Sequence, residues 1–366
     1  MAFGLFHTSP DIKRILIVRT DRLGDVVLTL PILPSLRRCF PDAYIAMLLK
    51  RYTGEIVEGN PYVNELLWYD DENGVVPFWK MCRVLRERKF DAAVVVYPRP
   101  RLAWLMACSR IPLRIGTGYR YYSFLFNRRV FEHRRDAKRH EVEYNLNLLK
   151  ELGCTSTAAI EFFIDIPEEA ESKVDTLLRN AGAERNCQVI VIHPGSGGSA
   201  REWPAEHFGL LAAHLSRDGA FVVVTGTYAE EREVDAVVLA AGGKALPLVG
   251  KLNVKELAAL LRRASLVIAN STGPLHIAAA VAAPVLGLYP QHTPMSVKRW
   301  GPCTERKVVL VPQKPADCSD CVRSGKRSCL CMASITVEQA YQGAVYLLHD
   351  HKTIETSAKA RGKDPC

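Results

Sequence analysis

The chain has 366 residues, about two to three times the length of an ordinary single domain, so two domains are expected. Hydrophobic residues make up 48% and charged residues 24%, which excludes a disordered or collagen-like chain. No apolar run reaches the roughly 18 to 20 residues that cross a bilayer, and the opening MAFGLFHTSPDIKR lacks the pattern of a secretory signal. We therefore expect a cytoplasmic protein.

The positive charge of the chain is concentrated in one segment. Lys and Arg number 48 against 39 Asp and Glu, a net charge of +9, and residues 98–140 alone contain eleven basic and two acidic residues. The rest of the chain is therefore neutral as a whole. Such a patch attracts the phosphates of a nucleic acid, an anionic lipid or a phosphorylated substrate. The alternative is a solvated loop that only raises solubility.

Hydrophobic periodicity predicts alternating strands and helices in the first half of the chain. Strands are expected at 14–18, 44–49, 65–69 and 92–97, and helices at 24–38, 53–59, 78–88 and 141–152. Pro31 and Pro34 are expected to shorten or kink the first of these helices. Alternation of this kind, without hairpin signals, predicts a parallel sheet covered by helices.

The alternation restarts after residue 165, which predicts a second α/β sheet. Helices are expected at 168–181, 205–217, 230–241, 254–263, 274–282 and 336–349, and strands at 189–192, 221–225, 266–269 and 285–289. We predict two Rossmann-like domains of doubly wound parallel sheet, residues 1–165 and 166–349, and a polar tail at 350–366. The domains are expected to face a central cleft, with the ligand at the carboxyl ends of the strands.

The eleven cysteines fall into two groups. Seven are scattered and are expected to be reduced, several as small core residues: Cys39, Cys82, Cys108, Cys154, Cys187, Cys303 and Cys366. The other four have the spacing C-x2-C-x7-C-x-C, and four thiolates satisfy the tetrahedral preference of zinc: Cys318, Cys321, Cys329 and Cys331. The last pair is spaced too tightly for the usual zinc knuckle, so a reduced or redox-sensitive loop is the alternative to a structural zinc site.

Two common nucleotide-binding motifs are missing. After the first strand the chain reads RTDRLGD, with one glycine where a dinucleotide-binding turn has three. The sequence GKRS at 325–328 lacks the earlier glycine of a P-loop. A nicotinamide dehydrogenase and a P-loop kinase are therefore disfavoured.

The loop after the strand at 189–192 suits a phosphate. It reads HPGSGGSAREWP, in which Gly195, Gly197 and Gly198 allow backbone N–H groups to approach phosphate oxygens. Arg201 adds a charged donor. A diphosphate fits this loop, and an ordinary flexible turn is the alternative.

A second loop, after the strand at 266–269, predicts a helix start that binds the same ligand. Pro274 suits the first turn of a helix and Ser271 or Thr272 its cap, so the free N–H groups and the positive end of the helix dipole are available. The glycine-rich loop likewise leads into the helix expected from residue 205. The two helix starts together therefore indicate one pyrophosphate site. Glu230, just after a third strand, either accepts hydrogen bonds from ribose hydroxyls or is a surface acid.

Three motifs in combination resemble the ADP-heptose:lipopolysaccharide heptosyltransferases. They are RILIVRTDRLGDVVLTLPILPSLRRCFP, HPGSGGSAREWPAEHF and NSTGPLHIAAAVAAPVLGLYP, in that order, and the resemblance spans roughly residues 14–348. It implies a glycosyltransferase B arrangement, with the acceptor bound by the first domain and the nucleotide sugar by the second. It also implies inverting, metal-independent transfer of L-glycero-D-manno-heptose from ADP-heptose to the lipopolysaccharide inner core or a lipid A precursor, without a cofactor.

The motifs and the resemblance together predict the site residues. The aspartate general base of the family's GD pair falls on Asp25, whose alternative role is to cap the helix that it opens. The donor diphosphate is assigned to His193, Gly195, Ser196, Gly197, Arg201, Ser271, Thr272, Gly273 and His276, and the adenosine to Thr225, Gly226 and Glu230. The acceptor is assigned to Arg22, Arg120, Arg128 and Arg129, with the protein at the inner face of the cytoplasmic membrane and no nucleic-acid partner.

One position departs from the family pattern. Many members have aspartate before the S/T-G pair, where this chain has Ser271. A family member that uses another nucleotide sugar or acceptor is therefore the first alternative. The others are a non-catalytic protein that binds a sugar nucleotide or an anionic surface, and, more distantly, a sugar-nucleotide epimerase.

Overall fold

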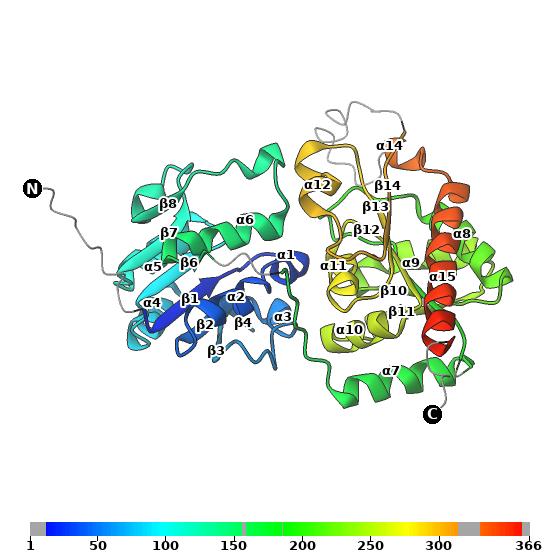
Figure 1. The fold of residues 1–366 in the computed structure, drawn as a ribbon, viewed down its shortest axis with the longest axis horizontal. Helices are drawn as coiled ribbons and strands as arrows, with labels where there is room; N and C mark the ends of the chain where they lie inside the picture. Colours follow the sequence, from blue (N-terminus) through cyan, green and yellow to red (C-terminus); the bar gives the residue numbers. More distant parts are fainter. Residues whose placement is uncertain (1–11, 156–158, 185, 314–329, 361–366) are drawn as a thin grey trace, which may run out of the picture. The chain divides into compact units, whose positions relative to one another are not determined.

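The computed structural model describes residues 12–155, 159–184, 186–313 and 330–360 (Figure 1). The chain divides into two compact units: unit 1 comprises residues 1–134 and 139–165, and unit 2 comprises residues 135–138 and 166–366. Within the described residues, each unit is built on a six-stranded sheet in which every neighbouring pair of strands is parallel. Two α/β domains of parallel sheet were predicted, and this prediction is confirmed.

The sheet of unit 1 has the strand order β3-β2-β1-β6-β7-β8. Its strands are β1 (Arg14–Val18), β2 (Tyr44–Leu49), β3 (Glu65–Trp68), β6 (Ala92–Val95), β7 (Leu113–Thr117) and β8 (Arg128–Val130). β1 pairs with β2 on one side and β6 on the other, and Ile15 to Val18 are fully buried. A strand covered on both faces is expected to be apolar throughout. The chain that leaves β1 at Arg19 therefore starts from the middle of the sheet.

The first helical segment of unit 1 is broken in two. α1 (Leu23–Val27) ends before Pro31, and α2 (Ile32–Cys39) begins after it. The predicted shortening at the prolines is confirmed, because proline lacks the N–H group that a continuous helix needs. The other helices are α3 (Arg51–Gly54), α4 (Phe78–Glu87), α5 (Pro100–Cys108) and α6 (Glu141–Asn147), with 3₁₀ turns η1 (Ser123–Leu125), η2 (Arg134–Asp136) and η3 (Leu148–Leu152) and a small hairpin, β4 (Asp70–Asp71) and β5 (Gly74–Val75).

The basic segment at 98–140 is more regular than expected. It contains α5, η1 and the strands β7 and β8, which complete one side of the sheet. β7 reads LRIGT and β8 reads RRV, so neither has the apolar run by which a buried strand is found. Their position at the end of the sheet explains why arginine is tolerated there.

The sheet of unit 2 has the order β11-β10-β9-β12-β13-β14. Its strands are β9 (Val189–His193), β10 (Phe221–Gly226), β11 (Ala245–Val249), β12 (Leu266–Asn270), β13 (Val285–Leu288) and β14 (Lys307–Leu310). β11 and β14 were not predicted, because as edge strands they are only partly buried. β9 pairs with β12 so that Ala269 lies beside His193. The loops that follow these two strands therefore leave the sheet side by side.

Helices pack on this sheet around a core that includes Trp203 and Phe208 (Figure 1). They are α7 (Glu168–Asn180), α8 (Ala205–Arg217), α9 (Glu231–Ala240), α10 (Val254–Arg263), α11 (Gly273–Ala280), α12 (Val297–Trp300), α14 (Leu330–Ala333) and α15 (Val337–Ala360), with 3₁₀ turns η4 (Tyr228–Glu230) and η5 (Thr293–Met295). The prediction that the last helix ends at residue 349 is wrong, since α15 continues to Ala360. None of the helices in the described ranges offers the long apolar stretch that would cross a bilayer.

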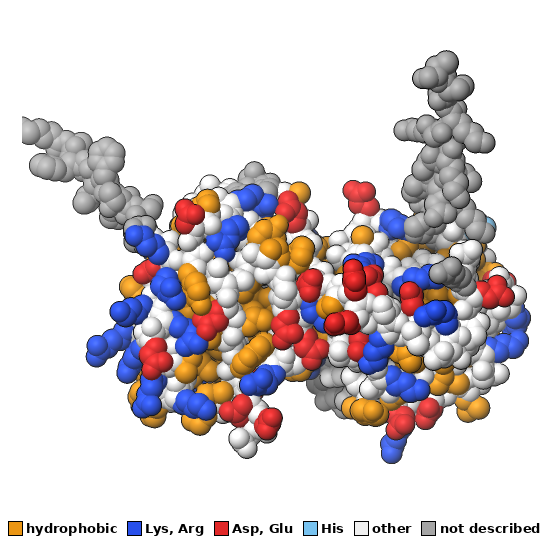
Figure 2. Space-filling view, turned by 90° about the horizontal axis from the view of Figure 1, so that it is seen from below, with side chains coloured by type: hydrophobic (Ala, Val, Ile, Leu, Met, Phe, Trp, Pro, Cys, Tyr) orange, Lys and Arg blue, Asp and Glu red, His pale blue; other side chains and the backbone are white. Residues whose placement is uncertain are grey.

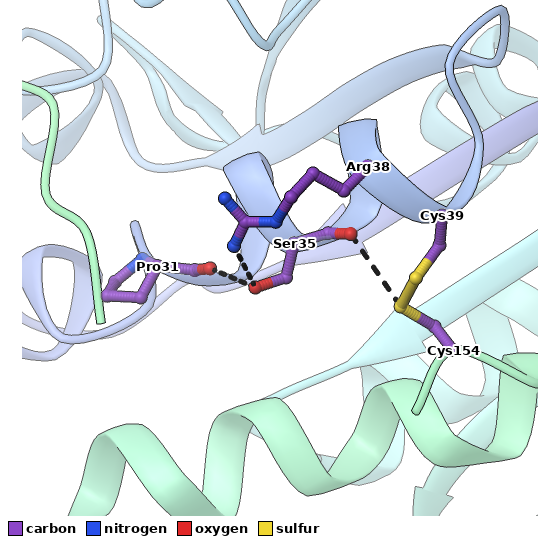
Figure 3. The surroundings of a disulfide bond; sticks show 5 residues. All are labelled: Pro31, Ser35, Arg38, Cys39 and Cys154. Carbon is purple, nitrogen blue, oxygen red and sulfur yellow. Dashed lines mark hydrogen bonds between the residues drawn. A yellow bond between two sulfur atoms is a disulfide. The ribbon is translucent and has the colours of Figure 1, made fainter. Parts of the chain in front are cut away.

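Two of the scattered cysteines form a disulfide. Cys39, at the end of α2, is bonded to Cys154, 115 residues later, and Figure 3 shows the bond beside Ser35 and Arg38. The prediction that all seven are reduced is wrong for this pair. It rested on the expected cellular compartment, and a bond between such distant cysteines leaves no local signal in the sequence. Closing a loop of this length stabilises a fold by about 4 to 5 kcal/mol in the chain-entropy account.

Candidate active site

Asp25 lies just after the central strand of unit 1, in the first turn of α1. The residue that caps this helix is Arg22, so the alternative role of Asp25 as the helix cap is wrong. The side chain of Asp25 is 18% exposed. It is therefore reachable from solvent although the turn that carries it leaves the middle of the sheet.

A buried arginine holds this carboxylate. Arg19 is 2% exposed, and its Nη2 donates to Asp25 Oδ1 at 2.6 Å while its Nε donates to Asp21 Oδ1 at 2.8 Å. Its Nη1 lies 3.6 Å from Oε1 of Glu141, which also accepts from Arg134 Nη1 at 2.6 Å. One guanidinium thus fixes three carboxylates, and the ion pair with Asp25 uses only Oδ1.

Burial and charge set the ionisation of this group. Burial lowers the pKa of Arg19, but Asp21, Asp25 and Glu141 outweigh it, so the pKa lies above its ordinary value and Arg19 stays charged. Burial raises the pKa of Asp21 to about 6, against the opposing effect of Arg19 and with the help of nearby Asp25. No role was predicted for Arg19, Asp21 or Glu141. Arg19 and Asp21 lie a few residues before the Gly-Asp pair, so the sequence held a local signal for these two residues. Glu141 lies more than a hundred residues away and gives no such signal.

In unit 2, the glycine loop after β9 has the backbone that was expected. Gly197 and Gly198 have φ of +51° and +74°, the left-handed region that favours glycine. At Gly195, an added Cβ would lie 2.2 Å from Oε1 of Glu230. The loop therefore needs glycine at these positions for two different reasons, backbone conformation and close approach, and an ordinary flexible turn does not describe it.

Glu230 holds this loop from η4, the 3₁₀ turn that follows the neighbouring strand β10. It is 5% exposed; its Oε1 accepts from the N–H of Gly197 at 3.1 Å, and its Oε2 accepts from the N–H and hydroxyl of Thr227 at 3.0 and 2.9 Å. Burial alone would raise the pKa of this carboxyl, but these donors, together with nearby His193, lower it below its ordinary value. The alternative of Glu230 as a surface acid is wrong.

His193 ends β9 inside the same cluster. Its Nδ1 lies 3.0 Å from the hydroxyl oxygen of Thr225, and its Nε2 lies 3.8 Å from Oε2 of Glu230. Burial lowers the pKa of His193 below its ordinary value, against the opposing effect of Glu230. Ser196 shapes the next part of the loop, since its hydroxyl donates to a carboxylate oxygen of Glu202 and accepts from the N–H of Gly198.

Asn270 joins the two loops that were predicted to bind one ligand. Its side chain is fully buried, donates to the carbonyl of Pro194 at 2.7 Å and accepts from the N–H of Trp203 at 2.9 Å. Asn270 thus ties the end of β12 to both ends of the glycine loop. No role was predicted for Asn270 beyond its place in a motif, because a hydrogen bond across 76 positions has no local signature in the sequence.

The start of α11 follows immediately. Thr272 is its N-cap residue and is 4% exposed, and its hydroxyl oxygen has no hydrogen-bond partner among the described residues. His276 is buried one turn further on, its ring 6.5 Å from that of Trp300. A buried hydroxyl without a partner costs free energy, and Thr272 is one of several buried side chains with such an atom among the described residues.

The remaining predicted residues lie in the same elements or on the surface of unit 1. Gly273 opens α11 and Gly226 ends β10, while Arg201 and Ser271 are half-buried within the two loops. Arg22, Arg120, Arg128 and Arg129 are exposed in unit 1, and Arg129 Nε donates to the carbonyl of Phe126 at 3.1 Å.

The proposed zinc ligands are only partly visible. Cys318, Cys321 and Cys329 lie outside the described residues, and Cys331 is buried in the core of unit 2 with Met332 and Ile335. Within the described ranges, no three or more His, Cys, Asp or Glu side chains are grouped so that they could hold a metal ion. The zinc site therefore stays an untested prediction.

The structure thus has a parallel α/β sheet in each unit, a carboxylate held by a buried arginine in unit 1, and two loops joined by Asn270 in unit 2. The model of glycosyltransferase family 9 (heptosyltransferase) matches residues 78–329. Because this range is more than half of the chain, the protein belongs to that family and is a glycosyltransferase. The family resemblance predicted from the three sequence motifs is confirmed.

Individual relatives agree with this assignment. Lipopolysaccharide heptosyltransferase 3 of Escherichia coli is 29% identical over 275 residues, which are 73% of this chain and 80% of the relative. The glycosyl transferase family 9 structure from Veillonella parvula DSM 2008 has a TM-score of 0.80 at 26% identity, covering 93% of this chain and 99% of that one. E. coli ADP-heptose lps heptosyltransferase II has a TM-score of 0.75 at 20% identity, with 93% and 99% covered, and shows the same fold.

Proposed function

We propose that this protein transfers a heptose from ADP-heptose to the inner core of lipopolysaccharide or a lipid A precursor, with inversion at the anomeric carbon. The names of two of its similar proteins support the substrates: one is a lipopolysaccharide heptosyltransferase, and the other is described as an ADP-heptose lps heptosyltransferase. The observation that carries the proposal is the buried hydroxyl of Thr272, which lacks a hydrogen-bond partner among the described residues at the start of α11.

The donor would bind to unit 2. The N–H groups at the start of α11 and the hydroxyl of Thr272 would meet one phosphate, and the glycine loop with Arg201 the other. Asn270 supports this assignment because it holds both loops in one arrangement. Oε1 of Glu230 accepts one hydrogen bond, from Gly197, and keeps a lone pair for a ribose hydroxyl, whereas Oε2 already accepts two from Thr227. His193, Gly195, Ser196, Thr225, Gly226, Gly273 and His276 would line or shape the same site.

Asp25 would remove the proton from the acceptor hydroxyl as that hydroxyl attacks the anomeric carbon. Its ion pair with Arg19 uses Oδ1, which leaves the other oxygen to accept the proton. General-base assistance of this kind contributes about 10² to 10⁴ in rate. The charge that develops on the departing ADP would be stabilised by Arg201 and the start of α11, so the reaction as proposed needs neither a metal ion nor a cofactor.

The acceptor would bind to unit 1, at the inner face of the cytoplasmic membrane. Arg22 occupies the N-cap position of α1, three residues before Asp25, and Arg22, Arg120, Arg128 and Arg129 are exposed. Arginine recognises carboxylates and phosphates through paired hydrogen bonds. Charge reversal at Arg120 and Arg128 should therefore weaken use of the acceptor and spare binding of ADP.

Ser271 favours one other candidate, a transferase of this family that uses a different nucleotide sugar. Where many members carry an aspartate, the side chain here is hydrogen-bonded to Tyr289, whose hydroxyl donates to the carbonyl of Trp300 at 2.7 Å. A contact to the donor sugar is then changed. This candidate differs from the leading one in the sugar and keeps the same catalytic groups.

Release of nucleotide from a panel of nucleotide sugars tests both candidates. The purified enzyme should turn over ADP-heptose in the presence of a heptose-deficient core acceptor, and Ser271→Asp should leave that donor preferred. Turnover of another nucleotide sugar, with none of ADP-heptose, would reject the leading proposal in favour of the second.

A further inference from the structure

Helix α6 of unit 1 buries a carboxylate and an amide on one face. Glu141 is 1% exposed and Asn145 is fully buried, and because they are four residues apart they lie on the same side of the helix. Charged side chains ordinarily stay at the surface, as many Lys, Arg, Asp and Glu side chains of unit 1 do at the left of Figure 2. The contacts of these two buried groups show what they hold.

Glu141 reaches Asp25 through one arginine. Its Oε1 lies 3.6 Å from Nη1 of Arg19, whose Nη2 donates to Asp25 Oδ1 at 2.6 Å. Glu141 is itself held, because the same Oε1 accepts from Nη1 of Arg134 at 2.6 Å. A fixed negative charge therefore attracts the guanidinium at a different nitrogen from the one that binds Asp25. This attraction limits the directions in which Arg19 can offer Nη2.

Asn145 reaches Asp25 through the main chain. Its Nδ2 donates to the carbonyl of Leu28 at 3.0 Å and to Oγ1 of Thr29 at 3.4 Å. The hydroxyl of Thr29 in turn donates to the carbonyl of Asp25 at 2.8 Å. Leu28 is the C-cap residue of α1, where carbonyls have no partner within the helix. The turn that carries Asp25 is therefore tied to α6 by its backbone as well as by its side chain.

Stability alone is a weak reason for this arrangement. A buried ion pair often contributes no more stability than apolar side chains of similar volume, because the charges lose their hydration on burial. A fully bonded polar network does give its members one fixed arrangement. Here that arrangement includes the carboxylate proposed to accept a proton. Misplacing a reacting group by about 1 Å can lower a rate by about 10², so the two ties have a kinetic consequence.

We propose that Glu141 and Asn145 are positioning residues for the proton acceptor. The proposal rests on the proposed function for the role of Asp25, and it deepens that function by assigning α6 as the helix that fixes the carboxylate. Glu141 acts through Arg19 on the side chain. Asn145 acts through Thr29 on the main chain. Both are buried, so their loss should slow the reacting step and leave the binding of substrates unchanged.

Glu141→Gln tests the side-chain tie, because it keeps the size of the residue and removes its charge. It should lower kcat by about 10- to 100-fold and change the KM for ADP-heptose by less than about twofold. Val142→Ala, which truncates a fully buried apolar residue of the same helix, is the matched control. It should lower stability in denaturant unfolding and leave kcat near that of the wild type.

Thr29→Val tests the main-chain tie with a milder change. It keeps the shape of the side chain and removes the hydroxyl between Asn145 and the carbonyl of Asp25. It should lower kcat by about 2- to 10-fold, the effect of one hydrogen bond, with ADP affinity unchanged.

Combining Glu141→Gln with Asp25→Asn separates positioning from a general effect on the fold. In the Asp25→Asn background, Glu141→Gln should cause no further loss of the residual kcat, because residues that act as a unit have non-additive effects. Crystal structures add a readout that needs no turnover. In Glu141→Gln, the distance from Arg19 Nη2 to Asp25 Oδ1 should lengthen, or the carboxylate should turn.

Three results would overturn the inference: a kcat of Glu141→Gln equal to that of Val142→Ala, a loss of activity that is due to KM alone, or a further loss of rate in the Asp25→Asn background. An unmoved Asp25 in the crystal structure of Glu141→Gln would also overturn it. Failure of the proposed function looks different. The wild type would then transfer no heptose from ADP-heptose, while the displacement of Asp25 in Glu141→Gln would still be seen.

Discussion

The two candidate sites hold their polar groups in opposite ways. In unit 1, Arg19 is buried among carboxylates and fixes Asp25 by a charged contact. In unit 2, the glycine loop is held by the buried carboxylate of Glu230, which accepts from the N–H of Gly197, and by the amide of Asn270, beside the buried His193. A proton acceptor has to be anionic and fixed, whereas a diphosphate needs donors that are already oriented. The difference suits a division of labour between acceptor activation and donor binding.

The largest effect should come from removing the proton acceptor. Asp25→Asn keeps the size of the side chain and should lower turnover by about 10² to 10⁴ with little change in ADP affinity, because the donor loops lie in unit 2. Steady-state rates and calorimetric titration with ADP measure the two quantities. Asp42→Asn, an exposed carboxylate of the same unit, is the matched control. If Asp25→Asn retained turnover near that of the control, the proton acceptor would have to be sought elsewhere.

Arg19 tests whether the charged site depends on the cation that its three carboxylates share. Arg19→Gln leaves Asp21, Asp25 and Glu141 without their shared partner, and loss of one member of a buried ion pair costs about 3 to 5 kcal/mol of unfolding free energy. Arg38→Gln breaks an exposed pair with Glu161 and should cost less than about 1 kcal/mol. Denaturant unfolding compares them. Equal costs would mean that the buried network adds nothing to the stability of unit 1.

The sequence predicted what is local in each site. The central strands and the loops after them were found because a buried parallel strand is an apolar run and a glycine-rich turn follows it, as at 189–192 and Gly195. The break at Pro31 was found for the same reason, since proline acts on its own helix. Asp25 and Thr272 were each predicted from a separate short motif, in which the informative residues lie within a few positions of one another.

What holds the sites together could not be predicted, because it acts across the chain. Arg19 meets Glu141, Trp203 meets Asn270 and Cys39 meets Cys154 over separations that no periodicity records. The strands β7 and β8 were missed for a different reason, because arginines at the end of a sheet remove the apolar signal.

The pH dependence of the unfolding free energy should reveal a smaller effect, at Asp21 in the charged site of unit 1. The pKa of Asp21 is raised to about 6, above its unfolded value near 4, so between these values the folded protein binds more protons than the unfolded one. The contribution of Asp21 to stability is therefore largest at low pH and declines as pH rises from about 4 to 6, by on the order of 1 to 3 kcal/mol. Asp21→Asn should remove this decline in denaturant unfolding series. An unchanged profile would show that Asp21 titrates normally.

The smallest effect, at Thr272, has the most distinctive sign. Thr272→Val keeps the shape of the side chain and removes a buried hydroxyl that has no partner among the described residues, so unfolding free energy should rise by about 1 kcal/mol without ligand. ADP affinity should nevertheless fall by about 2- to 10-fold, because the hydroxyl gains its bond only from the diphosphate. Thr53→Val, whose hydroxyl donates to the carbonyl of Lys50 at 3.0 Å, should instead lower stability and leave ADP affinity unchanged. A Thr272→Val enzyme that lost stability, or bound ADP as the wild type does, would show that the hydroxyl serves the fold of unit 2 and has no part in binding the donor.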